Sequence, residues 1–268
     1  MIIRGIAQAI FLFSIVASAS AQQQAILLKA HSHNDYKRRH PLHDALNNGF
    51  FSIEADVFYE NGRFIVAHTK AGIRKKNTLE KIYLQPLLER AVKNNNKVYA
   101  HGPLEFELMI DLKDYWDSAR LDSLKRLIEN YAGLFTAFNQ EKKTSAAVRI
   151  LLSGNGAKYL AAEHNPRYFS IDGGFGDFES QLDSNIICRT SASFRSLFDW
   201  QGIGNMPERE RKMLDEFVTR AHASGRKIRF WAATSKRKVW KELLDAGVDR
   251  VNVDKLKKFR KFYAGYYD

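Results

Sequence analysis

Two acidic residues and two histidines lie close together in the first third of this 268-residue chain. Glu54 and Asp56 are two residues apart in a β-rich run, so both side chains should leave one strand on the same face. Two buried carboxylates repel each other unless a cation or a proton lies between them. His31 precedes this pair and His68 follows it. Carboxylate oxygens suit Mg²⁺ or Ca²⁺, and imidazoles move protons near neutral pH, so the pattern predicts metal-assisted acid–base chemistry.

Glu54 and Asp56 also have an ordinary interpretation, as charged residues on a surface strand. Apolar Ile53 and Val57 flank the pair, however, and two histidines lie nearby in the chain, so a buried functional pair is the favoured prediction. Such a pair needs a strand that carries it and neighbouring segments that bring further side chains to the same place.

Short β-rich runs alternate with longer helical patterns after residue 25. Eight strands in such an alternation predict a (β/α)8 TIM barrel, an α/β fold whose active site lies at the carboxyl ends of the strands. The predicted strands are 26–31, 51–57, 106–112, 147–152, 168–172, 186–190, 228–232 and 250–253, with a hairpin from 57–60 to 63–67. The predicted helices are 41–48, 79–94, 118–138, 156–163, 207–224, 236–246 and a last segment from residue 254.

Residues that could do chemistry stand at or near the ends of these strands, as a barrel requires. An open, doubly wound sheet is the alternative, but no glycine-rich phosphate-binding loop follows the first predicted strand. The strand-end candidates are His31, Glu54, Asp56, Asp111, Asp172, Trp231 and Asn252.

The first 21 residues have the composition of a secretory signal peptide. Arg4 precedes an apolar run over 6–16, and small residues at 19–21 predict cleavage after Ala21. The apolar run is too short for a membrane span, and an uncleaved anchor is the alternative. The sequence therefore predicts a secreted or periplasmic protein in which residues 22–268 form a single barrel domain.

The chain has a formal net charge of +12 and one cysteine. A single cysteine excludes a disulfide within the chain, and Cys188 lies in an apolar run typical of a buried strand. The charge favours acidic partners, but no nucleic-acid-binding motif is present, so a phosphate-bearing small molecule is expected and nucleic acid is not. The tail from Leu256 interleaves cations with aromatic residues, which predicts a last barrel helix or a weak contact with an anionic membrane surface.

The order of these motifs resembles the phospholipase-C-like phosphodiesterase superfamily, which includes glycerophosphodiester phosphodiesterases and venom sphingomyelinase D. Within it, the runs HSHNDY and SIEADVF are most similar to the altered-inheritance-of-mitochondria phosphodiesterase-like group. The glycerophosphodiesterase pattern is matched at His31, Gly49, Glu54, Asp56 and His68. The sphingomyelinase pattern is matched at Asp111-Leu112-Lys113 and is resembled around Trp231 and Asn252. Ser32-His33 stands where glycerophosphodiesterases have Arg-Gly, so the match concerns the phosphodiester class more than a glycerol-type substrate.

The resemblance implies a phosphoric diester hydrolase or lyase that acts on glycerophosphodiester- or phospholipid-like substrates. It implies that Glu54, Asp56 and Asp111 hold Mg²⁺ or Ca²⁺, and that His31 and His68 are the catalytic acid–base pair. The candidates for substrate binding are His33, Asn34, Lys113, Trp231 and Asn252, with Asp172 and Ser191 on weaker grounds.

Two other functions stay open. Zinc-type barrel hydrolases also place H-x-H after their first strand, as in His31-Ser32-His33, but they build His-rich metal clusters. The later histidines of this chain fall in predicted loops or helices, which counts against that class. A non-catalytic barrel that binds phosphate or lipid is the other alternative, because a fold alone does not establish activity.

Overall fold

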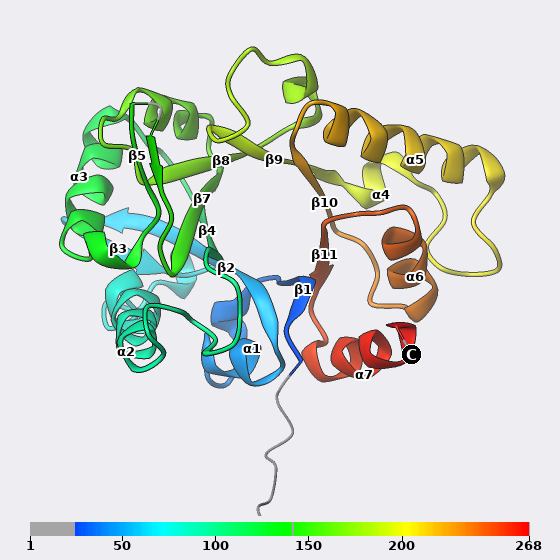
Figure 1. Ribbon diagram of the computed structural model, residues 1–268, viewed down its shortest axis with the longest axis horizontal. Coiled ribbons are helices and arrows are strands. Elements are labelled where there is room, and N and C mark those ends of the chain that lie inside the picture. Colours follow the sequence, from blue (N-terminus) through cyan, green and yellow to red (C-terminus); the bar gives the residue numbers. More distant parts are fainter. Residues whose placement is uncertain (1–24, 141, 268) are drawn as a thin grey trace, which may run out of the picture.

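The computed structural model describes residues 25–140 and 142–267, which form a closed barrel of parallel strands surrounded by helices (Figure 1). The first and last strands, β1 (Leu27–Ser32) and β11 (Arg250–Val253), are hydrogen-bonded to each other, and β1 also pairs with β2 (Phe50–Glu60), which closes the sheet. The other barrel strands are β4 (Phe106–Leu112), β7 (Val148–Gly154), β8 (Phe169–Gly173), β9 (Ile187–Ser193) and β10 (Lys227–Trp231). The predicted (β/α)8 barrel is confirmed.

Two short antiparallel pairs extend beyond the eight-stranded barrel. β3 (Arg63–Val66) pairs with the end of β2 across Asn61 and Gly62, whose φ angles of 51° and 76° suit a two-residue hairpin turn. This is the predicted hairpin. The second pair, β5 (Ala137–Asn139) and β6 (Lys142–Thr144), was not predicted.

The helices lie outside the ring of strands (Figure 1). No helix in the described part of the chain is both long enough and apolar enough to cross a membrane. A π-helix, Glu80–Leu84, runs directly into α2. The helices are α1 (His43–Asn47), α2 (Gln85–Lys93), α3 (Ser118–Glu129), α4 (Phe194–Leu197), α5 (Glu208–Ala223), α6 (Arg237–Asp245) and α7 (Leu256–Tyr267).

The predicted helix over 118–138 is too long, and the segment over 156–163 is not an α-helix. α3 ends at Glu129, and the chain then forms a 3-10 helix, Ala132–Leu134, before β5. Gly133 and the β-favouring aromatic run that follows disfavour continuation of the helix. The second segment is a 3-10 helix, Gly156–Glu163. The final predicted helix is α7, where Phe259 and Phe262 pack against Trp240.

Alternation along each strand separates an apolar layer from a polar barrel interior. In β4, for example, Phe106, Leu108 and Ile110 belong to the apolar core between sheet and helices, whereas Glu107 and Asp111 bond to residues of other strands. This period of two is what a closed sheet imposes on its two faces. Cys188 is buried, as predicted, in a small apolar cluster with Met109 and Leu151.

An ion network closes the amino-terminal end of the barrel. The buried carboxylate of Glu107 contacts Arg250 Nε at 2.7 Å, Lys227 Nζ at 2.9 Å and Arg189 Nη1 at 3.3 Å. Burial opposes ionisation of Glu107, but these three cations outweigh burial and hold the pKa of Glu107 well below its usual value. The barrel floor therefore depends on one buried negative charge.

We expect Glu107→Gln to lower the free energy of unfolding by about 3–5 kcal/mol at pH 7, because it leaves buried cations without their partner. The depressed pKa means that the contribution of Glu107 is present above about pH 4.3 and is lost as the pH falls through the pKa of the folded state. Urea denaturation measures the change. The exposed Glu208, which pairs with Lys212, is the control, and Glu208→Gln should change stability by less than about 0.5 kcal/mol. Equal effects of the two substitutions would contradict the importance of this network.

Candidate active site

A cavity of about 400 Å³ lies at the carboxyl ends of the barrel strands. Five of the predicted site residues line it, namely His33, Glu54, Asp111, Lys113 and Trp231, together with the weaker candidates Asp172 and Ser191. The remaining lining residues are Ser153, Gly154, Lys158, Gly173, Gly174 and Arg229. The structure thus brings side chains of six barrel strands to the place that the fold class predicts.

Asp56 and Asp111 stand at the same level of the barrel because they are register partners on neighbouring strands. The ammonium group of Lys113 lies between them, with Nζ 3.2 Å from Asp56 Oδ2 and 2.5 Å from Asp111 Oδ2. Ser153 donates a hydrogen bond of 2.5 Å to Asp111 Oδ1. Gly154 allows this approach, since its φ is +78° and a Cβ there would lie 2.8 Å from Asp111 Oδ1. The two carboxylates therefore converge on a position that a cation occupies.

Glu54, the third predicted metal ligand, is bonded to buried side chains of β1 and β10. Its Oε2 lies 3.2 Å from His31 Nε2 and 3.3 Å from Arg229 Nη1. Arg229 Nη2 also contacts Asp172 Oδ2 at 3.2 Å, and Arg229 Nη1 contacts Asn252 Oδ1 at 3.0 Å. Arg229 therefore holds Glu54, Asp172 and Asn252 in fixed positions.

His31 is completely buried below the cavity. Its Nδ1 lies 2.7 Å from Ser52 Oγ, and its Nε2 faces Glu54. A neutral imidazole satisfies the Ser52 contact in either tautomer, and its Nε2 faces both the acceptor Glu54 and the donor Arg229 Nη1, which is 3.2 Å away. Burial and the charge of Arg229 lower the pKa of His31 well below its usual value, which favours this neutral form.

His68 is half-exposed and is held beside Asp56. Its Nδ1 lies 3.0 Å from Asp56 Oδ2 and 2.9 Å from the hydroxyl oxygen of Tyr36. Tyr36 also donates a hydrogen bond of 2.6 Å to Asp56 Oδ2, and burial with the neighbouring carboxylate raises the pKa of Tyr36, so the hydroxyl keeps its proton. These contacts place the His68 proton on Nδ1 and leave Nε2 as a proton acceptor.

Buried Asp35 fixes the loop that follows β1. It accepts hydrogen bonds from Ser32 Oγ at 2.9 Å, from the backbone N–H of Leu42 at 2.6 Å and from the Tyr83 hydroxyl at 3.1 Å. This loop carries His33, whose Nδ1 lies 2.8 Å from Asp254 Oδ1. It also carries Asn34, which bonds to His33 and Tyr36 and does not line the cavity.

Sequence reasoning missed four site residues: Tyr36, Lys158, Arg189 and Arg229. A signal existed for Arg229, since it shares the inward-facing alternation of β10 with Trp231. Lys158 lies on a 3-10 helix and donates to the backbone oxygen of Asp172 at 2.7 Å, a contact that no spacing in the sequence indicates. Burial raises the pKa of Asp172, but Arg189 and Arg229 outweigh burial and hold it below its usual value.

The carboxylates at this end of the barrel offer oxygen atoms of the kind that divalent cations bind. Asp56 Oδ1 is buried and has no hydrogen-bond partner, and burial together with the charge of Glu54 raises the pKa of Asp56. A buried carboxylate oxygen without a donor is a place where a cation would be stabilised. Within residues 25–140 and 142–267, no three acidic, His or Cys side chains make a ready-made metal cluster. Carboxylate oxygens are the ligands that Mg²⁺ and Ca²⁺ prefer. In this structure, however, Glu54 is paired with His31 and Arg229, and Lys113 lies between Asp56 and Asp111.

Residues 19–172 match the AIM6-like phosphodiesterase domain family. The chain belongs to this family. Altered inheritance of mitochondria protein 6 of Eremothecium gossypii is 30% identical over 271 residues, which cover 88% of this chain and 70% of the relative. The homologue of that protein in Arthroderma benhamiae is 25% identical over 258 residues, which cover 85% of this chain and 81% of the relative. The family membership supports a function of the phosphodiesterase type and agrees with the resemblance found in the sequence.

Solved structures of glycerophosphodiester phosphodiesterases have the same fold. That of Parabacteroides distasonis superimposes with a TM-score of 0.55 at 14% identity, covering 90% of this chain and 98% of the other. That of Agrobacterium tumefaciens gives a TM-score of 0.51 at 16% identity, covering 89% and 100%. At these identities the similarity concerns the fold.

The relatives correct one prediction. The predicted signal peptide, residues 1–21, lies outside the described residues. The predicted secreted or periplasmic location is contradicted by the fungal relatives, whose names refer to the inheritance of mitochondria, organelles inside the cell. An apolar amino-terminal run followed by small residues was insufficient evidence for export.

Asp56→Asn should stabilise the protein in the presence of a chelator. The raised pKa of Asp56 means that the folded state holds this proton more tightly than the unfolded chain, so stability falls as the pH rises through the interval between the two pKa values. We expect the substitution to raise the free energy of unfolding by about 1 kcal/mol at pH 7, measured by urea denaturation.

Asp254→Asn is the matched control with the opposite sign. A hydrogen bond from His33 lowers the pKa of Asp254, so its ionised form favours folding and its loss should reduce stability. A loss of stability in both variants would show that the charge of Asp56 does not oppose folding.

Proposed function

We propose that this protein is a metal-dependent phosphodiesterase that cleaves glycerophosphodiester- or phospholipid-like substrates. The observation that carries the proposal is the convergence of Asp56 and Asp111 on one cation position, with an imidazole beside Asp56 and another beside Glu54. Family membership in the phosphodiesterase class supports it and favours it over the zinc-hydrolase alternative.

The cavity has the charges needed to bind a phosphodiester. Lys113, Lys158 and Arg229 line it. Arg229 presents a planar fork and the lysines act as point charges, which together suit a singly charged phosphate. Trp231 is 44% exposed at the rim, where it offers an apolar face to the rest of the substrate.

Glu54, Asp56 and Asp111 would hold the metal, with Mg²⁺ or Ca²⁺ as the expected ion. When bound, the ion would neutralise charge on the phosphate oxygens during cleavage. Lys113 would then be released from the two aspartates and made available to the phosphate. Arg229, which is itself held by Asn252, positions Glu54.

The two histidines have different surroundings, so we propose different roles in place of a matched acid–base pair. His68 Nε2 makes no hydrogen bond with a described residue, and its Nδ1 proton is held by Asp56 and Tyr36. His68 is therefore placed to take a proton from the attacking hydroxyl at Nε2. Buried, neutral His31 lies between Ser52, Glu54 and Arg229 and acts as a positioning residue for the Glu54 carboxylate.

The purified protein should hydrolyse bis(p-nitrophenyl) phosphate in the presence of Mg²⁺ or Ca²⁺. Removal of the metal by a chelator should lower the rate by at least about 100-fold, because charge stabilisation in such sites is worth several kcal/mol. Release of p-nitrophenol gives the rate, and re-addition of Mg²⁺ is the control for irreversible damage. Full activity in chelator, or no hydrolysis of this compound or of a lysophospholipid with any of these ions, would contradict the proposal.

Exogenous imidazole should separate the roles of the two histidines. We expect His68→Gly to lose about 100-fold or more in kcat and to recover activity when imidazole is added, since the site of His68 is open to solvent. Imidazole should not rescue His31→Gly, because His31 is completely buried. His31→Gln keeps an N–H donor and should therefore retain more activity than His31→Leu. Rescue of His31→Gly with no rescue of His68→Gly would reverse the assignment.

A further inference from the structure

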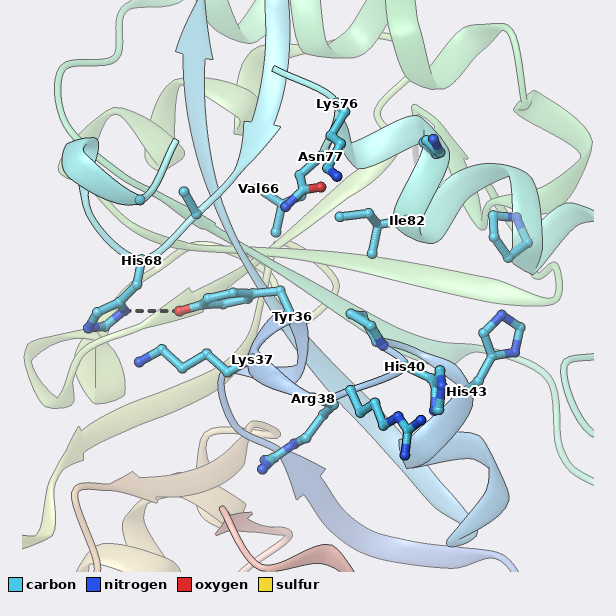
Figure 2. A pocket seen from close by; sticks show the side chains of 16 residues that line it. Tyr36, Lys37, Arg38, His40, His43, Val66, His68, Lys76, Asn77 and Ile82 are labelled. Carbon is cyan, nitrogen blue, oxygen red and sulfur yellow. Dashed lines mark hydrogen bonds between the residues drawn. The ribbon is translucent and has the colours of Figure 1, made fainter. Parts of the chain in front are cut away.

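A second, larger pocket of about 700 Å³ lies beside the active-site cavity and is strongly basic. Two loops that are distant in the sequence form its walls, the loop between β1 and α1 and the loop between β3 and the π-helix (Figure 2). We call this pocket the basic groove and define it by its five cationic residues: Lys37, Arg38, Arg39, Lys76 and Lys81.

The lining of the basic groove carries cations without a carboxylate, although Asp44 and Asp56 contact two of its histidines from outside the lining. In the described part of the chain none of the residues that line it is acidic, and His40, His43 and His68 add three imidazoles. The active-site cavity differs, since Glu54, Asp111 and Asp172 match its three cations in number. Like charges held in one concave surface raise the local potential and attract anions.

Four of the five cations are unpaired within the described part of the chain, while Arg38 bonds to backbone oxygens of His33, Val253 and Asp254. Lys37, Arg39, Lys76 and Lys81 are exposed and form no ion pair with any residue that the structure describes. Lys37 lies over the ring of Tyr36, with Nζ 6.0 Å from the ring centroid. These side chains are therefore available to a ligand.

The basic groove reaches the proposed catalytic centre. Figure 2 shows His68 and Tyr36 at one end of the pocket and His40 and His43 at the other. Tyr36 and His68 both contact Asp56 Oδ2, and that oxygen lies 3.2 Å from Lys113 Nζ, which lines the cavity. A single bound molecule can thus contact both sides of Asp56.

The rest of the groove surface is apolar and suits a ring or a polyol backbone. Its apolar lining residues are Val66, Ala67, Ile82 and Pro86. Ligand sites of this size commonly combine an apolar surface with a few charged groups that fix orientation. A phosphorylated head group, with anionic groups around a compact ring, has this complementary chemistry.

We propose that the basic groove binds additional phosphate groups of the substrate, so that the preferred substrate is a phosphodiester that carries at least one further phosphate on its head group. The inference rests on the proposed function for its catalytic part. The binding part is independent of turnover.

Binding is tested by titration calorimetry with inorganic pyrophosphate on the full chain. Lys76→Gln/Lys81→Gln should bind pyrophosphate about tenfold or more weakly than wild type. The reason is that the loss of one hydrogen bond between charged groups lowers an affinity by about that factor. Lys93→Gln/Lys142→Gln removes the same charge from exposed positions outside the groove and should bind as wild type does. Equal losses in both double variants, or no loss in either, would overturn the proposal.

Substrate preference is tested with glycerophosphoinositol and its 4-phosphate. We expect kcat/KM to be at least about tenfold higher for the phosphorylated compound with wild type, and the ratio to fall to about one in Lys76→Gln/Lys81→Gln. Hydrolysis of both compounds at the same rate by wild type would overturn the groove proposal and leave the proposed function standing.

Other outcomes are also decisive. If neither compound is hydrolysed, the proposed function fails, and the pyrophosphate titration alone decides whether the groove binds phosphate. If wild type binds phosphatidylserine vesicles but not pyrophosphate, the groove proposal is overturned in favour of a membrane-binding surface.

Discussion

The need to neutralise converging carboxylates is the constraint on which the carboxyl-terminal end of this barrel depends. Parallel register places Asp56 and Asp111 side by side, and Lys113 lies between them. Arg229 fulfils the same need for Glu54 and Asp172. These carboxylates could not be buried together without cations, because each would be a desolvated charge facing another. A site that demands positive charge is well suited to exchange a side-chain cation for a metal and to bind a phosphate against the displaced side chain.

The same constraint is satisfied differently at the two ends of the barrel. At the floor, three cations are paired with the buried carboxylate of Glu107, so the charges serve stability. At the mouth, cations and carboxylates are matched in number but remain accessible from the cavity. Beside the mouth, the basic groove has cations only. The positive charge without matching carboxylates is therefore concentrated in the basic groove, beside the active-site cavity. This charge distribution attracts anions toward the site.

The sequence allowed the fold and much of the site to be predicted, because both follow from periodicity. β-rich runs alternating with helical patterns identified the barrel, the two-residue spacing placed Glu54 and Asp56 on one face, and the strand end placed Asp111 near them. Contacts made by loops were not predictable: Tyr36 reaches Asp56 only because Asp35 fixes the path of its loop. Arg229 was missed although its alternation marked it as inward, since distances across a barrel are absent from sequence spacing. The burial of His31, which separates its role from that of His68, also required the structure.

The most direct test of the central claim is the position of a bound divalent ion. Crystals soaked with MnCl₂ and measured at the manganese absorption edge would locate the metal without reference to activity. The account predicts one strong anomalous peak bounded by Glu54, Asp56 and Asp111, with Lys113 moved away from the two aspartates. No peak at these carboxylates, with Lys113 still between Asp56 and Asp111, would contradict it.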